Sequence, residues 1–251
     1  LMTRAIDSLK LKGVGITDGE AEAVCIAILL HDIGHGPFSH TLENSIIENM
    51  HHETVSLRLM ERLNEQFDGR LTMAINIFLG KYHKPFLHEL VSSQLDMDRL
   101  DYLRRDSFFT GVSEGVVGSE RIIQMLNVAD GHLCVEAKGI DSIEKFLIAR
   151  RLMYWQVYLH KTVVGAEFLL MKIMQRAREL SATETLFCST HLNFFLQPHE
   201  EKIDLTSELS IQHFAELDDI EILSAIKHWR EHEDKVLRTL CKKLIKRDLL
   251  K

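Results

Sequence analysis

The chain has 251 residues, of which 45% are hydrophobic and 27% are charged, and its formal net charge is −7 at pH 7. These values are typical of a soluble globular protein and allow either one large domain or two small ones. The acidic balance argues against duplex nucleic acid as the main partner, although a local basic cluster would still suit a small phosphorylated ligand.

The cysteines and the apolar segments exclude two further classes of protein. The four cysteines are far apart and form no CxxC pair, which favours reduced thiols in a cytoplasmic protein over a disulfide framework. No apolar stretch approaches the roughly 20 residues that are needed to cross a bilayer. The first ten residues, LMTRAIDSLK, do not resemble a signal peptide, because no apolar segment follows the basic residues. We therefore expect no membrane association.

Most of the sequence has helical periodicity, which predicts a mainly α fold. Gly13 is suited to ending the first helix, and Thr17 or Asp18 is a candidate N-cap for the second. The third and fourth helices are separated by His51 and His52. The expected helices cover residues 2–12, 18–31, 38–50, 53–67, 87–106 and 141–180, and two more begin near Asp218 and Asp234.

The regular helical pattern is interrupted once, and it becomes more broken towards the C-terminus. Two short β-prone runs flank Asp130 and Gly131, which predicts a small β-hairpin insertion near residues 126–138. Asp141 and Glu144 have the D-x-x-E spacing of a capping box for the long helix that follows. We expect residues 1–180 to form the main domain and 181–251 to form a helical extension that packs on it.

The stretch AILLHDIGHGPFSHTLE, residues 27–43, places three histidines and two carboxylates directly after an apolar helix. His31 and His35 are four positions apart and would share one face of a helix. His31 and Asp32 offer adjacent nitrogen and oxygen ligands, a mixture that suits Mn, Fe, Ni, Zn or Mg better than a thiolate-selective metal. The alternative is a polar helix terminus with a solvated Asp32. The Gly-x-Gly-Pro turn favours a pocket, because it lets the backbone come close to a ligand.

A second group of polar residues lies in DMDRLDYLRRD, where Asp98, Tyr102 and Asp106 recur every four residues. This spacing predicts a stripe of acid, phenol and acid along one helix. The alternative is an exposed face stabilised by ion pairs four residues apart, and Asp101 with Arg105 fits that alternative well.

A third stripe lies on the long helix, and the pair of histidines before residue 53 is a fourth feature. Arg150, Tyr154, Tyr158 and Lys161 would share a face, where two cations beside two phenols would suit a phosphate chain and a stacked ring. A rim of amphipathic side chains around a core aromatic is the alternative. The stretch His51-His52-Glu53 places imidazoles beside a carboxylate, which suits proton transfer or phosphate contact as well as a helix cap.

Together these segments resemble the HD-domain phosphohydrolase superfamily, and in particular its deoxynucleoside triphosphate triphosphohydrolase-like branch. The matching stretches, in family order over about residues 18–165, are LLHDIGHGPFSHTLE, HHE, SSQLDMDRLDYLRRDSFFTG and ARRLMYWQVYLHK. The resemblance implies an HD-domain helical fold and a metal-dependent hydrolase that acts on nucleotides and releases a deoxynucleoside and triphosphate. It also implies a homo-oligomer.

The resemblance implies roles for particular residues. The family holds its divalent metal ion with an H…HD…D pattern, which here corresponds to His31, Asp32 and Asp98. The catalytic or phosphate-contacting histidines would be His35 and His52, and Glu43 would be the acidic partner of His35. The substrate-binding residues would be Tyr102 and Asp106 near the sugar, with Arg150, Tyr158 and Lys161 near the phosphates or base. His40 receives no role.

One element of the family pattern is missing, and other activities stay open. The first metal-binding histidine of the family lies in an R-x-x-H-S-L-G-like helix, whereas this chain has no histidine before His31. We expect that segment to precede Leu1, so that domain 1–180 is truncated at its N-terminus. A nucleotidase or a cyclic-nucleotide phosphodiesterase could use the same site. A non-catalytic nucleotide-binding regulatory module would be favoured if the first ligand were absent.

Overall fold

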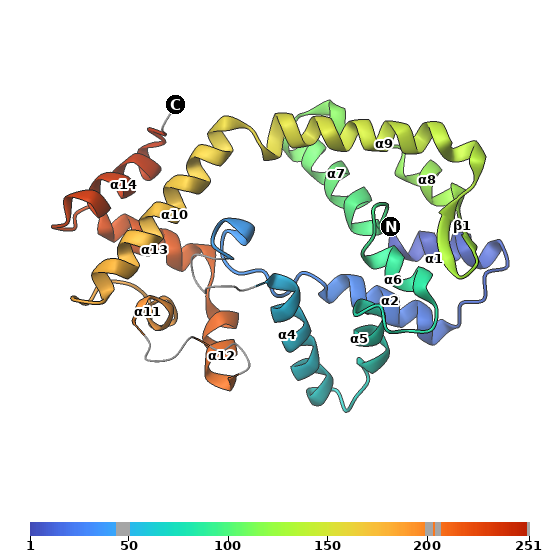
Figure 1. Ribbon diagram of the computed structural model, residues 1–251, viewed down its shortest axis with the longest axis horizontal. Helices are drawn as coiled ribbons and strands as arrows, with labels where there is room; N and C mark the ends of the chain where they lie inside the picture. Colours follow the sequence, from blue (N-terminus) through green and yellow to red (C-terminus); the bar gives the residue numbers. More distant parts are fainter. Residues whose placement is uncertain (44–50, 199–202, 204–206, 250–251) are drawn as a thin grey trace. The chain divides into compact units, whose positions relative to one another are not determined.

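The computed structural model describes residues 1–43, 51–198, 203 and 207–249 of the chain, and helices make up most of it (Figure 1). The predicted mainly α fold is confirmed. The described chain divides into two compact units, one formed by residues 1–32 and 60–160 and the other by residues 33–59 and 161–251. None of the described helices combines the length and the apolar character that crossing a membrane requires.

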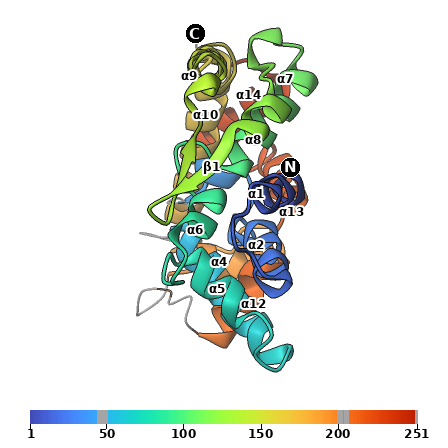
Figure 2. The ribbon, with the colours of Figure 1, turned by 90° about the vertical axis from the view of Figure 1, so that its right-hand side faces the viewer.

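The first unit carries most of the short helices and the small sheet. Helices α1 and α2 lie against each other in Figure 1 and Figure 2. The elements of this unit are α1 (Met2–Leu11), α2 (Asp18–Leu30), α5 (Thr72–Phe78), α6 (Pro85–Val91), α7 (Met97–Thr110), η2 (Ser113–Gly115), α8 (Ser119–Met125), β1 (Leu126–Ala129), β2 (His132–Val135), η3 (Ala137–Gly139), α9 (Ile140–Met153) and the π-helical stretch η4 (Tyr154–Tyr158).

The second unit is built around the long helix α10, which packs on α14. Its elements are η1 (Ser39–Thr41), α10 (Lys161–Ser181), α11 (Thr190–Leu196), α12 (Glu208–Glu216), α13 (Asp219–Trp229) and α14 (Lys235–Lys246). Helix α4 (His52–Gln66) contributes its residues up to Leu59 to this unit and the remainder to the first.

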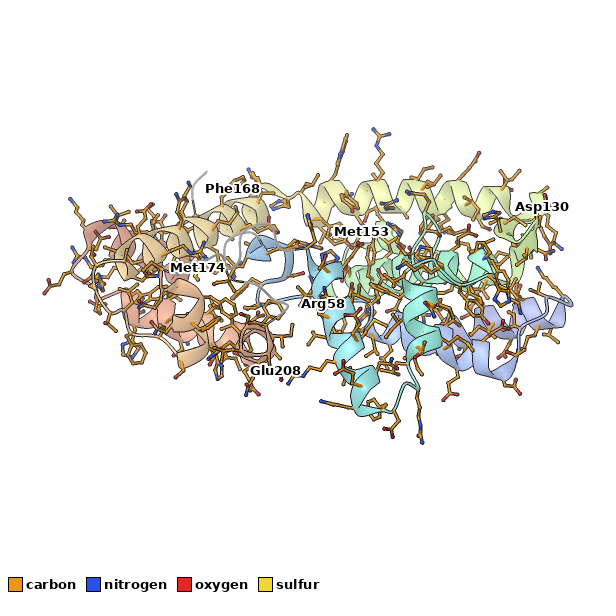
Figure 3. The ribbon with its side chains drawn as sticks, turned by 60° about the horizontal axis from the view of Figure 1, so that its bottom comes forward. Arg58, Asp130, Met153, Phe168, Met174 and Glu208 are labelled. Carbon is orange, nitrogen blue, oxygen red and sulfur yellow. The ribbon has the colours of Figure 1, made fainter. Side chains whose placement is uncertain are left out.

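Each unit has its own apolar core. The core of the first unit combines α1, α2, α5–α9 and β1, and that of the second combines α10–α14 with Leu42 and Val55. Met153 in the first unit and Met174 in the second are almost fully buried (Figure 3). The predicted boundary at residue 180 lies in the last turn of α10, so the division into compact units differs from the predicted ranges 1–180 and 181–251. The extent of the main domain stays a prediction.

Several helix ends follow the predicted local signals. Gly13 follows α1 with a positive φ of 84°. The hydroxyl of Thr17 accepts a hydrogen bond from the backbone N–H of Glu20, and the Glu20 carboxylate accepts one from the N–H of Thr17, which forms a complete capping box. Asp218 and Asp234 cap α13 and α14. The short polar side chain at each N-cap satisfies a backbone N–H that the helix leaves unpaired.

The predicted hairpin is confirmed, with Leu126 paired to Val135 and Ala129 paired to His132. Its turn residues Asp130 and Gly131 have φ values of 52° and 81°. Both values lie in the left-handed region that a two-residue hairpin turn of this hand requires.

The predicted helix over residues 87–106 is wrong, because the chain forms two helices there, α6 and α7, with an extended Ser92 between them. Asp96 is buried, and it accepts hydrogen bonds from the backbone N–H groups of Ser93 and Arg99. This cap starts a new helix at Met97. As a result, Asp98 lies in the first turn of α7.

The predicted single helix over residues 141–180 is also wrong. The chain forms α9, then the π-helical stretch η4, and then α10. Helix α9 begins after Gly139 without a side-chain cap, so Asp141 and Glu144 do not form the expected capping box. The backbone N–H of Leu159 bonds to the carbonyl of Tyr154, five residues earlier, and this wider turn is the mark of π geometry.

The predicted helix over residues 38–50 is represented in the described part of the chain by the 3₁₀ turn η1, and residues 44–50 lie outside the described residues. The fourth predicted helix is confirmed as α4, which begins at His52.

Gly34 lies where the chain packs closely on the start of α4. Its N–H donates a hydrogen bond to the hydroxyl of Ser56, 2.9 Å away. A Cβ atom at this position would lie 2.3 Å from the carbonyl oxygen of His52 and 2.3 Å from the backbone nitrogen of Ser56. Backbone atoms cannot yield as a flexible side chain can, so this position requires glycine.

We predict that Gly34→Ala lowers the free energy of unfolding by about 1–3 kcal/mol, because the backbone must move to admit the methyl group. Chemical denaturation followed by circular dichroism measures the change. Gly19→Ala is the matched control, because a Cβ at Gly19 meets nothing within 4 Å. Equal stability of the two variants would contradict the prediction.

The Glu20 carboxylate accepts hydrogen bonds from Tyr82, 2.9 Å away, and from Lys84, 2.7 Å away. Burial opposes ionisation of Glu20, but Lys84, the N–H of Thr17 and Tyr82 together lower its pKa to about 2. A folded-state pKa below the ordinary value of about 4.5 means that acid favours the unfolded chain.

We therefore expect Glu20→Gln to lower the melting temperature most above pH 4.5, where the carboxylate of the parent protein is ionised in both states. The difference between variant and parent should shrink as the pH falls from about 4.5 towards 2. Thermal melts across this range test it. A difference that is constant with pH would show that Glu20 does not contribute through its charge.

Candidate active site

The predicted metal ligands come together in the first unit. His31 follows the last residue of α2, and Asp32 comes next, while the break before α7 places Asp98 in that helix's first turn. The Nε2 atom of His31 lies 3.2 Å from Asp32 Oδ2 and 3.8 Å from Asp98 Oδ1. One nitrogen and two carboxylate oxygens thus lie within 4.8 Å of one another.

The orientation of His31 is set by the helix that carries it. Its Nδ1 lies 2.7 Å from the carbonyl oxygen of Ile28, one turn back in α2. A carbonyl can only accept, so Nδ1 carries the proton and donates it. Nε2 is then the nitrogen that faces the carboxylates, and its lone pair would be free for a metal once the ring loses its second proton. This arrangement is typical of a metal-binding histidine with an outer hydrogen-bond partner.

The electrostatics of this group favour a cation between the two carboxylates. Burial opposes protonation of His31, but the neighbouring carboxylates of Asp98 and Asp32 outweigh it and raise the pKa of the imidazole to about 9. The second proton on the imidazole gives His31 a positive charge, which reduces the repulsion between the two carboxylates. A divalent cation would supply that charge in its place, and the mixed nitrogen and oxygen donors fit such an ion.

The predicted substrate-binding residues on α7, α9 and η4 also come together in the first unit. The phenol of Tyr158 donates a hydrogen bond to Asp106 Oδ2 at 2.5 Å. The ring of Tyr158 meets those of Tyr102 and Tyr154 edge to face, at centroid distances of 6.1 and 5.2 Å. Burial and the hydrogen bond to Asp106 raise the pKa of Tyr158, so that it stays a neutral donor.

Arg150 lies beside this aromatic group. Its guanidinium is 5.8 Å from the ring centroid of Tyr154, and its Nη1 lies 3.2 Å from Gln94 Oε1. Lys161, the last residue of the predicted stripe, begins α10 in the second unit. The chain between Tyr158 and Lys161 leaves the helix, so the predicted single face over residues 150–161 is wrong.

Two of the remaining predicted residues, His35 and His52, form a histidine cluster in the second unit together with His40, which the sequence left without a role. The rings of His35 and His52 stack at a centroid distance of 4.1 Å with an interplanar angle of 12°. His40 meets both rings edge on, at 4.7 and 5.1 Å. Glu43 lies beside this cluster.

Glu43 is held by two members of the cluster. Its Oε1 accepts hydrogen bonds from the backbone N–H of His52, at 2.7 Å, and from His52 Nδ1, at 3.0 Å, while Oε2 lies 3.1 Å from His40 Nδ1. Burial raises the pKa of Glu43, but these hydrogen bonds outweigh it and lower the pKa to about 2. The sequence predicted Glu43 as the partner of His35, and this pairing stays a prediction. His35 Nδ1 lies 3.2 Å from Ser39 Oγ.

The sequence missed two residues that these contacts bring forward. His40 received no role, although its spacing of three residues from Glu43 is a recognisable signal for a local pair. Gln94 contacts Arg150 across 56 positions of sequence, and no local pattern could have indicated that contact.

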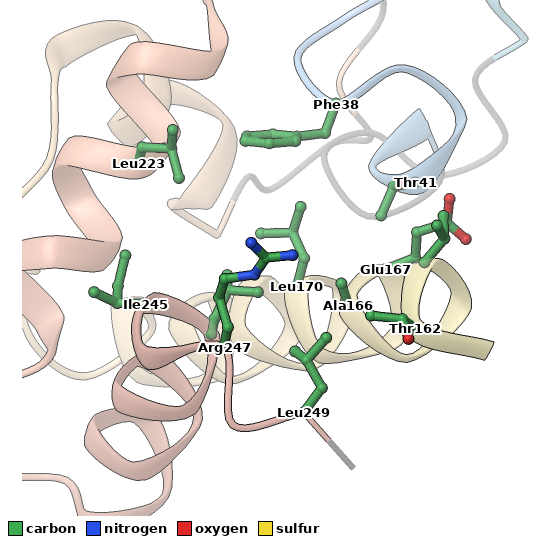
Figure 4. A pocket seen from close by; sticks show the side chains of 12 residues that line it. Phe38, Thr41, Thr162, Ala166, Glu167, Leu170, Leu223, Ile245, Arg247 and Leu249 are labelled. Carbon is green, nitrogen blue, oxygen red and sulfur yellow. The ribbon is translucent and has the colours of Figure 1, made fainter. Parts of the chain in front are cut away.

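The second unit also contains a largely apolar cavity of about 560 Å³ (Figure 4). The guanidinium of Arg247 reaches into it near Leu170, and Phe38 lies across from them. None of the twelve side chains that line this cavity belongs to the predicted site.

The comparisons with known proteins agree with the geometry. A model of the HD domain matches residues 5–106, and a model of an HD associated region matches residues 117–187. A crystal structure of a phosphohydrolase from Bacteroides thetaiotaomicron is similar over 100% of this chain and 62% of that chain, with 55% sequence identity and a TM-score of 0.95.

Two curated relatives extend the comparison. The uncharacterized protein YwfO of Bacillus subtilis is 31% identical over 92% of this chain and 53% of its own length. A deoxynucleoside triphosphate triphosphohydrolase SAMHD1 homolog of Dictyostelium discoideum is 30% identical over 68% of this chain and 37% of its own length. The chain thus spans about half or less of the length of these relatives.

The HD-domain match and the arrangement of His31, Asp32 and Asp98 define the class of protein to which the chain belongs. It belongs to the HD-domain phosphohydrolase superfamily. Its similarity to proteins named as deoxynucleoside triphosphate triphosphohydrolases, in Dictyostelium discoideum and in Gallus gallus, supports the branch that the motifs predicted.

We predict that Asp98→Asn removes most of the divalent metal bound at His31 and Asp32, because it deletes one anionic ligand and half of the charge facing the ion. Metal content after dialysis against Mn²⁺, measured by mass spectrometry, tests this. Asp101→Asn is the matched control on the same helix, since Asp101 pairs with Arg105 at 2.6 Å. If both variants retain the metal content of the parent, Asp98 is not a ligand.

Proposed function

We propose that the protein is a metal-dependent triphosphohydrolase that cleaves deoxynucleoside triphosphates into a deoxynucleoside and inorganic triphosphate. The observation that carries the proposal is the ligand group His31, Asp32 and Asp98 in the same unit as the Tyr158–Asp106 pair and Arg150. Relatives named as enzymes of this activity support the choice of substrate.

His31, Asp32 and Asp98 would hold a divalent cation, which supplies polarisation of a phosphoryl oxygen and a bound water of lowered pKa. Mn, Fe, Ni, Zn and Mg all suit this mixture of nitrogen and oxygen donors. The outer hydrogen bond from His31 Nδ1 to the Ile28 carbonyl keeps the ligand nitrogen aimed at the carboxylates.

The aromatic and acidic side chains would recognise the sugar. The Asp106 carboxylate can accept a hydrogen bond from a deoxyribose hydroxyl. The hydrogen bond from Tyr158 to Oδ2 would meanwhile fix the orientation of the carboxylate. The ring of Tyr102 packs beside Tyr158 and would limit the space at the sugar edge. A carboxylate that is already braced loses less conformational freedom on binding, and this favours a correctly placed substrate.

Two cations would neutralise the phosphate chain. Arg150 presents a planar guanidinium, which can bind a phosphate through two parallel hydrogen bonds. Lys161 would add a second positive charge. Positioning and charge neutralisation supply much of the rate in phosphoryl chemistry, because the reaction leaves little covalent work to the protein.

His35 and His52 would contact the phosphate or donate a proton to the leaving oxygen, and Glu43 would position His52. The peptide chain limits the distance to the metal ligands, because only two residues separate Asp32 from His35. Three peptide units span at most about 11 Å between Cα atoms. The Cα atom of His35 therefore stays within about 11 Å of the Cα atom of Asp32.

We further propose that the protein acts in the cytoplasm as a homo-oligomer. The cytoplasmic assignment is supported by the four cysteines, which are all free thiols in the structure. The proposal of an oligomer rests on the family resemblance.

Product identification with a panel of substrates tests the activity. Incubation of the protein and Mn²⁺ with each deoxynucleoside triphosphate should release deoxynucleoside and triphosphate in equal amounts. Release of orthophosphate from nucleoside monophosphates would instead indicate a nucleotidase, and opening of cyclic nucleotides a phosphodiesterase. Nucleotide binding without any product would indicate a regulatory module.

We predict that Tyr158→Phe lowers kcat/KM for deoxynucleoside triphosphates by about tenfold, which corresponds to the loss of one hydrogen bond to a charged group. Steady-state assays of deoxynucleoside release measure it. Tyr82→Phe makes the same chemical change at the phenol that bonds Glu20, and it should lower stability while leaving kcat/KM unchanged. Equal kcat/KM for Tyr158→Phe and the parent would exclude Tyr158 from the site.

A further inference from the structure

We propose that the largely apolar cavity of the second unit binds a small amphipathic anion, a free monocarboxylate with an alkyl chain of medium length. Every residue that lines the cavity belongs to the second unit. Its volume of about 560 Å³ lies in the range of cavities that bind small molecules. The proposal goes beyond the proposed function, because the cavity shares no residue with the candidate active site.

The walls of the cavity suit an alkyl chain. Leu170 from α10, Leu223 from α13 and Ile245 from α14 line it, and the ring of Phe38 extends into the same space (Figure 4). An alkyl chain among these side chains would leave water together with the apolar surface that it covers, and this burial favours binding.

Arg247 supplies the charge that selects the head group. It is the only cation among the residues that line the cavity, and its guanidinium reaches into the cavity (Figure 4). Within the part of the chain that the structure describes, this guanidinium has no hydrogen bond or ion pair. A carboxylate can accept two parallel hydrogen bonds from a guanidinium. Arg247 is exposed, so a ligand can reach it from solvent.

The backbone at Arg247 favours a different residue. Arg247 follows the last residue of α14 and has a φ of 54°. Glycine is the usual residue at such a left-handed helix end, because a Cβ atom is crowded there. The helix end does not explain the arginine, whereas an anion bound by its side chain does. This position also allows a substitution that removes the guanidinium without weakening the helix.

Glu167 limits the charge of the ligand. Its carboxylate lines the same cavity, and among the described residues it also has no hydrogen bond or ion pair. A ligand with several negative charges, such as a nucleotide, would be repelled by this carboxylate. A monocarboxylate can place its single charge at Arg247 and only its alkyl chain elsewhere. The cavity therefore favours a monoanion with an apolar tail.

Calorimetric titration with octanoate, below its micelle-forming concentration, tests the site. The parent protein should bind about one equivalent. Octylammonium has the same chain and the opposite charge, and butyrate has the same head group and a shorter chain. Both should bind at least tenfold more weakly, because each lacks one of the two features that the cavity recognises.

Arg247→Gly should lower the affinity for octanoate by about 10–100-fold, because it removes hydrogen bonds between two charged groups. Its melting temperature should equal or exceed that of the parent, since glycine fits the left-handed helix end. Lys246→Ala is the matched control, because it removes the same charge from an exposed neighbour that does not line the cavity. Its affinity for octanoate should be unchanged.

A second variant tests the cavity itself. Ala166 lines it from α10, and Ala166→Phe should fill part of the space and weaken octanoate binding at least tenfold while Arg247 is retained. Circular dichroism verifies that each variant is folded.

The outcomes are distinct. Weaker octanoate binding by folded Arg247→Gly, with unchanged binding by Lys246→Ala, supports the proposal. Equal affinity of Arg247→Gly and the parent would overturn it, as would the absence of octanoate binding by the parent. Binding to phosphatidylglycerol vesicles without binding of free octanoate would indicate a membrane surface and would also overturn it. None of these results affects the proposed function, which is tested by deoxynucleoside release without octanoate.

Discussion

The structure of the candidate site depends on one electrostatic constraint, the approach of two carboxylates to a single imidazole nitrogen. Asp32 and Asp98 lie 3.2 and 3.8 Å from His31 Nε2. Two carboxylates that approach the same nitrogen repel each other unless a cation lies between them. The helix end that supplies the histidine and the helix start that supplies the distal aspartate are therefore coupled through charge. The fold has to bring both ends to one point.

The break between α6 and α7 satisfies this constraint. A continuous helix over residues 87–106 would carry Asp98 in its middle. Asp98 would then lie away from a helix end. The buried carboxylate of Asp96 instead caps a new helix and pairs with Arg99, so Asp98 lies at the helix start. A carboxylate in the first turn is also stabilised by the partial positive charge of the helix N-terminus. The Asp96 cap thus starts α7 and also places the Asp98 carboxylate where the helix N-terminus stabilises its negative charge.

The sequence was sufficient for features that depend on near neighbours. The caps Thr17, Asp218 and Asp234 and the hairpin turn at Asp130 act within a few residues, and local patterns predicted them. The family motifs likewise predicted the ligand group at His31. The sequence failed where distant contacts compete with helical propensity. It predicted one helix over residues 141–180, whereas the chain forms α9, η4 and α10, and Tyr158 in η4 bonds to Asp106, 52 positions away.

The π-helical stretch η4 has a consequence for comparing this chain with its relatives. A π turn contains one more residue than the α turn that it replaces, and one residue corresponds to about 100° of rotation around a helix. The side chains after Tyr154 are therefore out of phase with those before it. In a relative whose helix lacks the bulge, the residue that corresponds in space to Tyr158 would be displaced by one position. An ungapped alignment through this segment would then pair side chains that face in different directions, and a residue of a relative that corresponds in space to Tyr158 would be aligned with its neighbour.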